Sequence, residues 1–349
     1  MSATDPTVQA EALHSLCAAA LAAAGARPAD AAAAARVLVE AELMGIATHG
    51  AIRVPDYARR LRSGGIDARA VPRLERRAPS LALLDGANAL GPVAGTRALE
   101  AAMDMAAATG IAWVGCRHGN HFGAIAPYAR TACEAGYAML AGTNASTTMP
   151  PWGGNELRLG NNPLCIAAPG PDGRHFILDI AMSVAARGKI RAARAAGARI
   201  PEGWAADANG RPTTDPAAAL AGFLLPLGAH KGSGLSMAVD LLSGVLSGAR
   251  FLTDVSSWVE RPDDPQGLGH FFVLIDPARL IGREAFAAAM ARFQHLVRST
   301  PAADPAQPVR LPGEDLLARR AQALVEGVSI PEKLLAELEQ LSASSGKSR

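Results

Sequence analysis

The pattern of apolar residues changes once along the chain, near residue 80, and this change constrains the fold more than any other feature. Before it, residues 6–24, 29–44 and 53–62 have the spacing of helices, and no strand-like run lies among them. After it, six short β-rich runs predict strands: "SLALLD", "IAWVGC", "YAMLAG", "LCIAAP", "HFILDI" and "HFFVLID". Helical segments are expected among them at 93–109, 124–135, 183–196 and 233–247. An all-helical unit therefore precedes a body in which helices and strands alternate.

We expect three parts in this chain of 349 residues, which is long enough for two or three domains. Residues 1–75 form a helical domain and residues 76–298 a mixed-sheet domain, so the predicted fold class is α+β with α/β-type interleaving. Residues 299–349 begin with the proline-rich stretch "STPAADPAQPVRLPG", which predicts an extended arm. A last helix at 331–341 packs back, and the Ser/Lys tail after it is predicted to be disordered.

The first helix is expected to have Asp5 as its N-cap, Pro6 at its first position and Gly25 past its end. Its stretch "LCAAALAAAGA" has the composition of a signal-peptide core, but Asp5 and Glu11 precede it and no Lys or Arg does. No apolar run reaches the length of a transmembrane span. The four cysteines include no CxxC pair and are interpreted as reduced packing residues, which favours the cytoplasm.

The charge of the chain is nearly balanced, with 34 Lys and Arg against 32 Asp and Glu and no long run of either sign. Nucleic acids and anionic membranes bind proteins through clusters of positive charge, so neither is an expected partner. The balance favours a small molecule or another protein as the partner.

Several reaction classes have local sequence signatures that this chain lacks. There is no GxGxxG after a strand, no GxxxxGK[ST], no HExxH and no GxSxG. Polar residues instead gather in glycine-rich junctions: "HGNHFG" (118–123), "TNASTTMPPWGG" (143–154), "GNNP" (160–163), "LDIAMSVAARGK" (178–189), "LGAHKGSG" (227–234) and "RLPGED" (310–315). One such junction alone is best interpreted as a turn. Six together indicate a site of nucleotide or cofactor size, because glycine lets the backbone approach a ligand closely.

The stretch "GIATHGAIRVPDY" places His49, Arg53 and Tyr57 four residues apart, directly after a helical run. If the segment is helical, the three side chains lie on one face. An imidazole, a guanidinium and a phenol on one face can hold a small anion.

Three other positions have two interpretations each. His118 and His121 are spaced as two metal ligands on a helix would be, but the Gly-Asn between them favours a hydrogen-bonding site, and no metal is expected. Asp179 ends an apolar strand and is either the N-cap of a helix beginning near Ser183 or a ligand to a ribose or a catalytic imidazole. Lys231, beside His230 at a helix start, is either a solvated charge or a contact for phosphate or carboxylate.

Taken together, the motifs resemble the type-2 malate/L-lactate dehydrogenase family. The resemblance rests on "GIATHGAIR", "NHFGAIAPYA", "MPPWGGNELRLGNNPL", "LDIAMSVAARGKI", "PEGWAADANGRPTTDP", "LLPLGAHKGSGLSMAVDLLSGVLSGA" and "RLPGE", in order from residue 45 to 314. Relatives in that family include sulfolactate, ureidoglycolate and diketogulonate oxidoreductases and reductases of cyclic imines. The motifs are specific for the family and not for the substrate.

The resemblance implies an oxidoreductase that uses NAD(H) or NADP(H) without a Rossmann fold. It implies a sulfolactate-dehydrogenase-like arrangement, in which a helical domain lies beside a mixed, largely antiparallel sheet domain that holds the cofactor, and it implies a homodimer. His49 of "THG" would be the proton donor, with Arg53, Tyr57 and His121 around the substrate and Asp179 grouped with them. The cofactor segments would be His175, Phe176, Ile177, Leu178, Asp179, Ile180 and Ala181, then His230 and Lys231, then Gly313, Glu314 and Asp315.

Two positions depart from the family pattern. Thr48 stands where many relatives have Ser, which keeps the hydroxyl and adds a methyl group, and Met182 stands where Thr is more usual. The second change removes a hydroxyl near the cofactor, so the choice between NAD and NADP stays open.

The predicted reaction interconverts a small 2-oxo acid and a 2-hydroxy acid similar to malate, lactate or sulfolactate, in a direction that stays open. Hydride transfer to the carbonyl carbon leaves an alkoxide that needs an acid, and a histidine has a suitable pKa, ordinarily about 6.5. Arg53 offers the substrate carboxylate a planar fork. The alternatives are a cyclic-imine reductase, a non-enzymatic binding protein on the same fold and, most distant, a metal hydrolase using His118 and His121.

Overall fold

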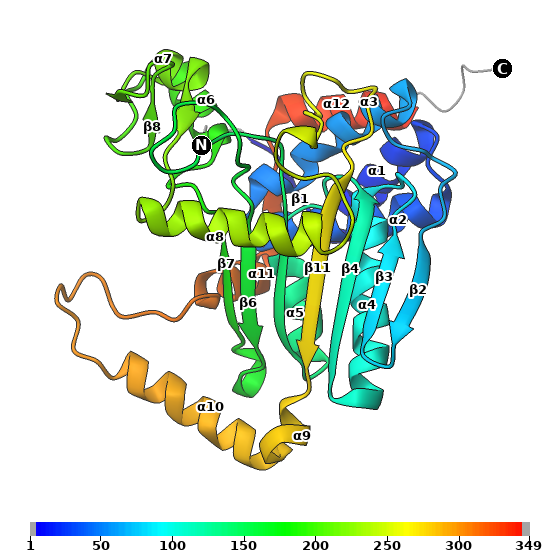
Figure 1. Cartoon of the computed structure of the whole chain (residues 1–349), viewed down its shortest axis with the longest axis vertical. Coiled ribbons are helices and arrows are strands. Elements are labelled where there is room, and N and C mark those ends of the chain that lie inside the picture. Colours follow the sequence, from blue (N-terminus) through cyan, green and yellow to red (C-terminus); the bar gives the residue numbers. More distant parts are fainter. Residues whose placement is uncertain (1–4, 344–349) are drawn as a thin grey trace.

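The structure of the protein, a computed structural model, describes residues 5–343. The tail predicted to be disordered begins after this range and lies outside the described residues. Within the range, one large sheet, a layer of helices behind it and a helical unit at one end make up the body (Figure 1).

Seven strands form the large sheet in the order β2-β3-β4-β11-β5-β6-β7. Their bounds are Arg73–Ala78 (β2), Leu81–Asp85 (β3), Ile111–Gly119 (β4), Ala138–Thr143 (β5), Leu164–Ala168 (β6), Phe176–Ile180 (β7) and Leu268–Ile275 (β11). Among the described strands only β3 and β4 pair in parallel, and the other neighbours are antiparallel. All six runs predicted as strands are in this sheet.

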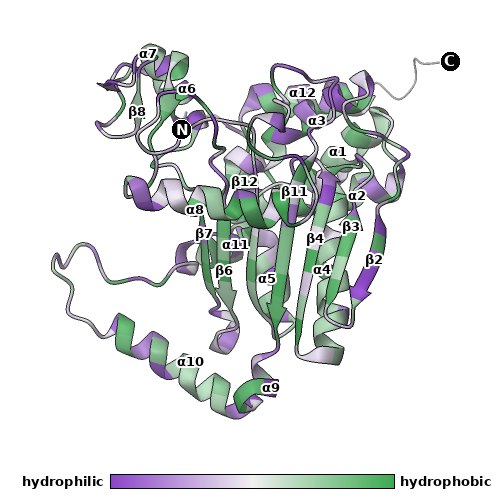
Figure 2. Ribbon diagram, viewed as in Figure 1, coloured by the Kyte–Doolittle hydropathy of each residue, from purple (hydrophilic) through white to green (hydrophobic). Residues whose placement is uncertain are grey.

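Strand β2 was not expected from the sequence. Its residues "RLERRA" are mostly charged, and Figure 2 shows it as the hydrophilic edge of an otherwise apolar sheet. Because an edge strand has only one neighbour and remains in water, it needs no alternation of apolar residues, and charge protects it from pairing with other chains.

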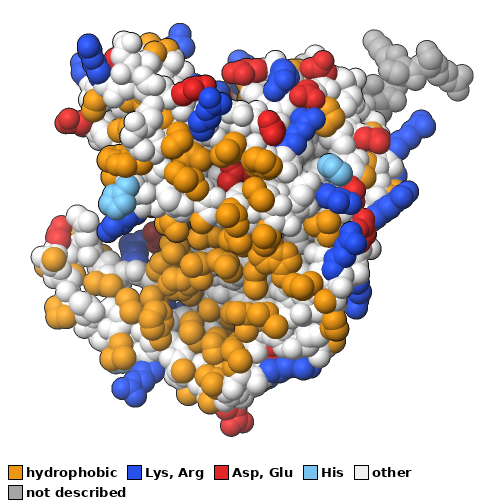
Figure 3. Space-filling model, viewed as in Figure 1, with side chains coloured by type: hydrophobic (Ala, Val, Ile, Leu, Met, Phe, Trp, Pro, Cys, Tyr) orange, Lys and Arg blue, Asp and Glu red, His pale blue; other side chains and the backbone are white. Residues whose placement is uncertain are grey.

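One face of the sheet carries a layer of helices. Helices α4 (Gly91–Thr109) and α5 (Ala126–Glu134) pack on it, and their small side chains form the main apolar core with the strands. On the other face, α8 (His230–Asp240) and the π-helical turn η4 (Leu241–Val245) cross the upper part of the sheet only. Below them the strands lie bare, and Figure 3 shows a broad apolar surface there.

A second core belongs to the helical unit. Helices α1 (Ala10–Ala23), α2 (Pro28–Leu43) and α3 (Val54–Ser63) pack with α12 (Glu332–Ala343) from the other end of the chain. The short strands β1 (Thr7–Val8) and β12 (Val328–Ser329) also join the two ends.

The predicted start of the first helix is wrong. Residues 7–8 pair as β1 with β12, so the helix begins at Ala10 with Gln9 at the capping position, and Asp5 and Pro6 precede the strand. A long-range backbone pairing has overridden a local capping signal. The predicted end is confirmed, because Gly25 follows the helix with a φ of 109°.

A small lobe lies between β7 and α8. It contains α6 (Arg187–Ala195), α7 (Pro216–Ala221) and three two-residue strands, β8 (Ala205–Ala206), β9 (Pro212–Thr213) and β10 (Phe223–Leu224). Its own apolar core includes Met182, Ile190 and Ile200. Helix α6 starts later than the predicted 183, and α8 starts three residues before the predicted 233.

The last part of the body begins with α9 (Pro277–Ile281) and α10 (Arg283–Arg298), which extends away from the sheet in Figure 1. Residues 299–313 contain no helix or strand, as the proline-rich sequence predicts, and lead to α11 (Glu314–Glu326) beside α2. Single 3₁₀ turns complete the structure: η1 (Ala47–His49), η2 (Ala51–Arg53), η3 (Pro171–Gly173) and η5 (Leu252–Asp254). Among residues 5–343, no helix has the length and apolar character that crossing a membrane requires.

Candidate active site

The stretch that carries His49 and Arg53 is not one helix, so the single helical face considered above does not exist. His49 ends η1, Arg53 ends η2, and Gly50 between them has an extended ψ of −142°. The carboxylate of the buried Glu42 accepts a hydrogen bond from the amide of Ala51, at 2.9 Å. A Cβ on Gly50 would lie 2.0 Å from that carboxylate, which explains the glycine in the "THG" motif.

His49 is held by its neighbour and by a second histidine. Its Nδ1 lies 3.0 Å from the hydroxyl of Thr48, and its ring stacks on that of His121 with centroids 5.4 Å apart. Burial, and secondly the charge of Arg53, lower the pKa of His49 to about 4. The ring is therefore neutral at pH 7, and its Nε2 makes no hydrogen bond to any residue between 5 and 343.

The hydrogen bonds of Tyr57 determine the tautomer of His121. The Tyr57 hydroxyl donates to the backbone carbonyl of His121 at 2.9 Å, and its oxygen lies 2.8 Å from Nδ1 of the same residue. Since the hydroxyl has only one proton, Nδ1 of His121 must carry a proton and donate it to that oxygen. The Nε2 of His121 is then an acceptor. Burial and the nearby charges of His49 and Arg53 keep the pKa of His121 well below its usual range.

Trp258 lies against His121 and Arg53 and was not selected as a site residue from the sequence. Its ring stacks on His121 at 4.6 Å, and the guanidinium of Arg53 lies over it at 5.2 Å from the ring centroid. The Nε of Arg53 donates to the carbonyl of Thr48 at 2.6 Å. The residues therefore form a closed circuit in the order His49, His121, Trp258, Arg53 and Thr48. A single tryptophan in the turn-rich, charged stretch "SSWVERPDDP" was the one available signal.

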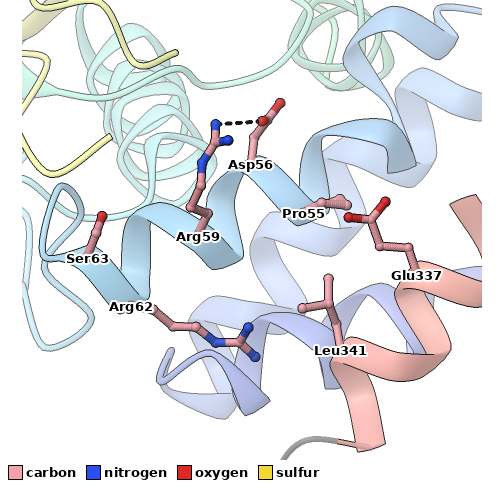
Figure 4. Close-up of a pocket in the computed structure, with 7 residues that line it drawn as sticks. All are labelled: Pro55, Asp56, Arg59, Arg62, Ser63, Glu337 and Leu341. Atoms are coloured by element: carbon pink, nitrogen blue, oxygen red, sulfur yellow. Dashed lines mark hydrogen bonds and ion pairs between the residues drawn. The ribbon is translucent and has the colours of Figure 1, made fainter. Parts of the chain in front are cut away.

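Asp56 connects Arg53 to a groove on the surface. One carboxylate oxygen lies 3.2 Å from Arg53 and the other 3.0 Å from Arg59. The groove has a volume of about 560 Å³ and lies between α3 and α12 (Figure 4). None of the predicted site residues lines it; its walls are Pro55, Asp56, Arg59, Arg62, Ser63, Glu337 and Leu341.

The two histidines considered as metal ligands have separate partners. Nδ1 of His118 lies 3.0 Å from the carboxylate of Asp85 on the exposed side of β4, whereas His121 bonds Tyr57. No cluster of three or more potential metal ligands exists among residues 5–343.

Asp179 is not the cap of a helix near Ser183, and that interpretation is wrong. Its carboxylate accepts hydrogen bonds from the amides of Ile125 and Ala126, at 3.1 and 2.8 Å, so it caps α5 from the neighbouring strand. Burial raises the pKa of Asp179 to about 6, although the two amides favour the ionised form. A role for this carboxylate in catalysis stays a prediction.

The three predicted cofactor segments meet around β7. The backbone of Ile177 donates to the carbonyl of Pro312 at 3.0 Å, and a Cβ on Gly313 would lie 2.8 Å from the same nitrogen. Beyond the end of β7, Met182 accepts a hydrogen bond from Leu227, at 2.8 Å, in the loop that leads to α8. Segments 175–181, 227–231 and 312–315 are thus neighbours in space.

His230 and Lys231 lie at the start of α8, both exposed. The ring of His230 contacts the edge of Trp152 at 6.5 Å, and the ammonium of Lys231 has no hydrogen-bond or ion-pair partner within residues 5–343. The helix has eleven residues, and the amide of Lys231 donates to the carbonyl of Gly228 at 3.2 Å.

Comparison with known proteins agrees with this geometry. Residues 8–339 match the family model described as malate/L-lactate dehydrogenase. A Delta(1)-pyrroline-2-carboxylate reductase of Ancylobacter novellus is 39% identical over 94% of this chain and 95% of its own length. A ureidoglycolate dehydrogenase (NAD(+)) of Escherichia coli strain K12 is 37% identical over 94% and 93%. The structure of sulfolactate dehydrogenase from Methanocaldococcus jannaschii superposes with a TM-score of 0.91 at 33% identity, covering 98% of each chain.

The fold and the comparisons define the class of the protein as an oxidoreductase. The chain belongs to the malate/L-lactate dehydrogenase family. The predicted family, fold class and enzyme class are confirmed.

Proposed function

We propose that this protein interconverts a small 2-oxo acid and the matching 2-hydroxy acid with NAD(H) or NADP(H), and that His49 exchanges the proton. The observation that carries the proposal is the placement of a neutral imidazole, His49, beside the arginine fork of Arg53 within one short stretch. The names of the ureidoglycolate and sulfolactate dehydrogenases support the same chemistry for this chain, whereas that of the pyrroline-2-carboxylate reductase keeps the cyclic imine as the rival substrate.

Each side chain has a defined task in this proposal. Arg53 binds the substrate carboxylate through its free N–H groups while Thr48 and Asp56 hold the rest of the guanidinium. His49 donates a proton from Nε2 to the carbonyl oxygen as negative charge develops there. Nε2 of His121 accepts a hydrogen bond from a substrate hydroxyl, and Tyr57 keeps that imidazole in its tautomer. The bound nicotinamide supplies the hydride.

The low pKa of His49 is compatible with the role of an acid. The positive charge of Arg53 contributes to lowering this pKa in the free enzyme. A carboxylate bound to Arg53 cancels that charge and adds a negative one nearby, so it raises the pKa of His49 when the proton is needed. In the oxidation direction the neutral ring is already the required base.

The cofactor is proposed to lie along β7, between the start of α8 and the segment Gly313–Asp315, away from any GxGxxG turn. The contact of Pro312 and Gly313 with Ile177, the hydrogen bond from Leu227 to Met182 just past β7, and the ammonium of Lys231, unpartnered among the described residues, support this placement. A phosphate group fits a lysine at a helix start. In this scheme residues 1–75 contribute His49, residues 76–298 hold the cofactor and residues 299–349 bring the arm over β7.

A homodimer is part of the proposal. The uncovered sheet face exposes Leu81, Ile111 and Ile166 at 45 to 48%, and Leu241 and Val245 above them at 51 and 54%. Apolar surface of this breadth marks a protein interface. Sedimentation analysis at several concentrations should give twice the mass of the chain. The four cysteines are free and buried, which supports a reducing compartment such as the cytoplasm.

The proposal is tested by oxidation of NADH and NADPH against a panel of 2-oxo acids, with cyclic imino acids as the rival substrates. Turnover of at least one 2-oxo acid, abolished by His49→Asn, is expected. Titration of nicotinamide fluorescence separates cofactor binding from turnover. Binding of neither cofactor would refute the proposal, and turnover of imines alone would replace it with the reductase alternative.

A further inference from the structure

We propose that Trp258 is a specificity-determining wall of the substrate pocket, and that the pocket accepts a monocarboxylic 2-oxo acid with an uncharged side chain in preference to a dicarboxylic or sulfonated one. The inference rests on the proposed function and specifies its substrate class. Both kinds of side chain are compatible with the family, because a second anion is present in sulfolactate and absent from pyrroline-2-carboxylate.

The position of Trp258 places the indole next to any substrate held by the two reacting groups. Its ring contacts His121 at 4.6 Å and has Arg53 above it at 5.2 Å. His49 lies on His121 in the same circuit. A substrate whose carboxylate is on Arg53 and whose carbonyl oxygen is near His49 therefore lies close to the half-buried indole, and the part of the ring that His121 and Arg53 leave uncovered can offer its side chain an apolar contact.

The loop that carries Trp258, residues 256–267, is anchored rather than loosely attached. Its base is closed by a hydrogen bond from Ser256 to the carbonyl of Gln266, at 3.2 Å, and the side chain of Gln266 accepts one from the amide of His121, at 2.9 Å. The fully buried Arg60 donates to the carbonyl of Asp264, at 3.0 Å. Arg60 thus fixes the loop against the helical unit, and the amide of His121 fixes it against the residues that follow β4.

Arg53 is the cation placed to bind the substrate carboxylate, because Thr48 and Asp56 occupy its Nε and Nη1 and leave Nη2. Arg60 is fully buried; its Nη2 donates to oxygens of Gly65, Asn120 and Asp264, while its Nε and Nη1 have no partner among the described residues. The loop itself contributes the acidic residues Glu260, Asp263 and Asp264 against the single Arg261. Asp264 is paired with Arg250 and Arg261, so these two cations are also occupied. A second anion on the substrate would lie against the aromatic ring of Trp258 without a free cation beside it, which opposes its binding.

Two further cations are close in the fold but have other partners. A Cβ on Gly188 would lie 3.8 Å from the methyl group of Thr48, so the start of α6 approaches the site. Of its neighbours, Arg187 donates to the carbonyl of Leu220 at 2.6 Å, and the ammonium of Lys189 lies over Trp204 at 5.9 Å. Arg187 is the side chain that would have to be released to receive a second anion, and it therefore serves in the test.

The experiment compares kcat/KM for pyruvate, 2-oxobutanoate and 2-oxoisovalerate with that for oxaloacetate and sulfopyruvate, using NADH and NADPH. We measure the parent, Trp258→Ala, Trp258→Phe and Arg187→Gln, with Val259→Ala as the control because that side chain is 47% exposed on the same loop. The melting temperature of each variant identifies loss of fold, and Trp258→Phe retains an aromatic wall if the alanine variant is unstable.

The parent is expected to prefer the uncharged substrates by about tenfold or more, the scale of a changed pocket contact. Trp258→Ala should reduce this preference mainly through KM for the uncharged substrates, while Trp258→Phe and Val259→Ala preserve it. A preference for oxaloacetate or sulfopyruvate that Arg187→Gln removes would overturn the inference, as would an unchanged preference in Trp258→Ala. Failure of the proposed function would be distinct, because no 2-oxo acid would then be reduced with either cofactor.

Discussion

The ring of His121 lies against that of His49, with centroids 5.4 Å apart and an angle of 25° between the planes. Two imidazoles so close repel each other when both are protonated, and the charge of His49 contributes to keeping the pKa of His121 low. Nδ1 of His121 is hydrogen-bonded to the Tyr57 hydroxyl, whereas the ring of His49 is hydrogen-bonded to Thr48 alone among the described residues and its Nε2 is available. The pair therefore consists of one ring whose position and tautomer are fixed by Tyr57 and one ring whose Nε2 is available for the proposed proton exchange.

Replacing His49 with Asn should lower kcat by roughly 10²–10⁴-fold, the usual contribution of general acid–base catalysis. The cofactor should bind normally, because the proposed cofactor segments do not include this residue. Steady-state kinetics and fluorescence titration measure the two effects. His118→Asn is the matched control, since this histidine is exposed and bonds Asp85. A near-normal kcat in the His49 variant would disprove the assignment.

The pH dependence should differ between the two directions. His49 has a pKa of about 4 in the free enzyme, so its neutral form persists at neutral pH. We expect kcat/KM for oxidation to be flat above about pH 6 and to fall toward pH 4, because protonation removes the base. For reduction, kcat/KM should fall as pH rises above that pKa. The pKa of His49 that appears in the pH profile of kcat should be higher than the one in the profile of kcat/KM, because the carboxylate of the bound substrate neutralises Arg53. Equal pKa values in kcat and kcat/KM would contradict the coupling to Arg53.

Arg53→Lys should cost about 1.5–3 kcal/mol in the activation free energy derived from kcat/KM, although it keeps the charge. A lysine cannot bond the carbonyl of Thr48 and the substrate carboxylate with the same planar geometry. Arg59→Lys is the control, since Arg59 shares the partner Asp56 but is half exposed. Full activity in Arg53→Lys would mean that charge alone orients the substrate.

Lys231→Ala should raise the dissociation constant of NADH or NADPH roughly ten- to a hundredfold, the equivalent of one charged hydrogen bond. The melting temperature should stay the same, because the ammonium has no partner among residues 5–343. Fluorescence titration measures the affinity, and Lys333→Ala on α12 serves as the control. Unchanged affinity would require the cofactor to lie elsewhere.

Asp179→Ala should lower the free energy of unfolding by about 1–3 kcal/mol, because the amides of Ile125 and Ala126 lose their acceptor. The pKa of about 6 lies above the ordinary 3.8, so the folded state binds the proton more tightly, and the carboxyl contributes less stability as pH rises through this window. Asp179→Asn should remove this pH dependence of the free energy of unfolding, which denaturant titrations at several pH values measure. A large loss of kcat in a fully stable Asn variant would instead support a catalytic role.

The central strands of the sheet could be predicted because their residues are buried and apolar. β11 is an example: its run "HFFVLID" is bounded by turn residues and has pairing partners on both sides. β2 could not be predicted in this way, since an edge strand in water needs no apolar pattern. Helix α10 was missed even though its alanine-rich sequence is typical of a helix.

For the site, spacing singled out His49, Arg53 and Tyr57, the family resemblance added His121, and the structure brings all four together. Neither signal identified Trp258 or Glu42. Trp258 reaches His121 only because β4 and β11 pair, and each strand leads into or out of a loop at the same end of the sheet. Glu42 looks like an ordinary helical residue until Gly50 packs on its carboxylate. Such contacts depend on tertiary packing that no local pattern encodes.

The pairing of β1 with β12 has a consequence for how the protein forms during synthesis. Leu13 and Cys17 near the start of the chain share a core with Ile330 and Leu338 near its end. Until residues 328–343 have been synthesised, this core lacks the side chains of β12 and α12. All seven strands of the large sheet precede these residues in the chain. The turn carrying His49 rests on the same helical unit. We therefore expect the nascent chain to form its sheet before the proposed proton donor is fixed in place, since α12 is synthesised after all seven strands of the sheet.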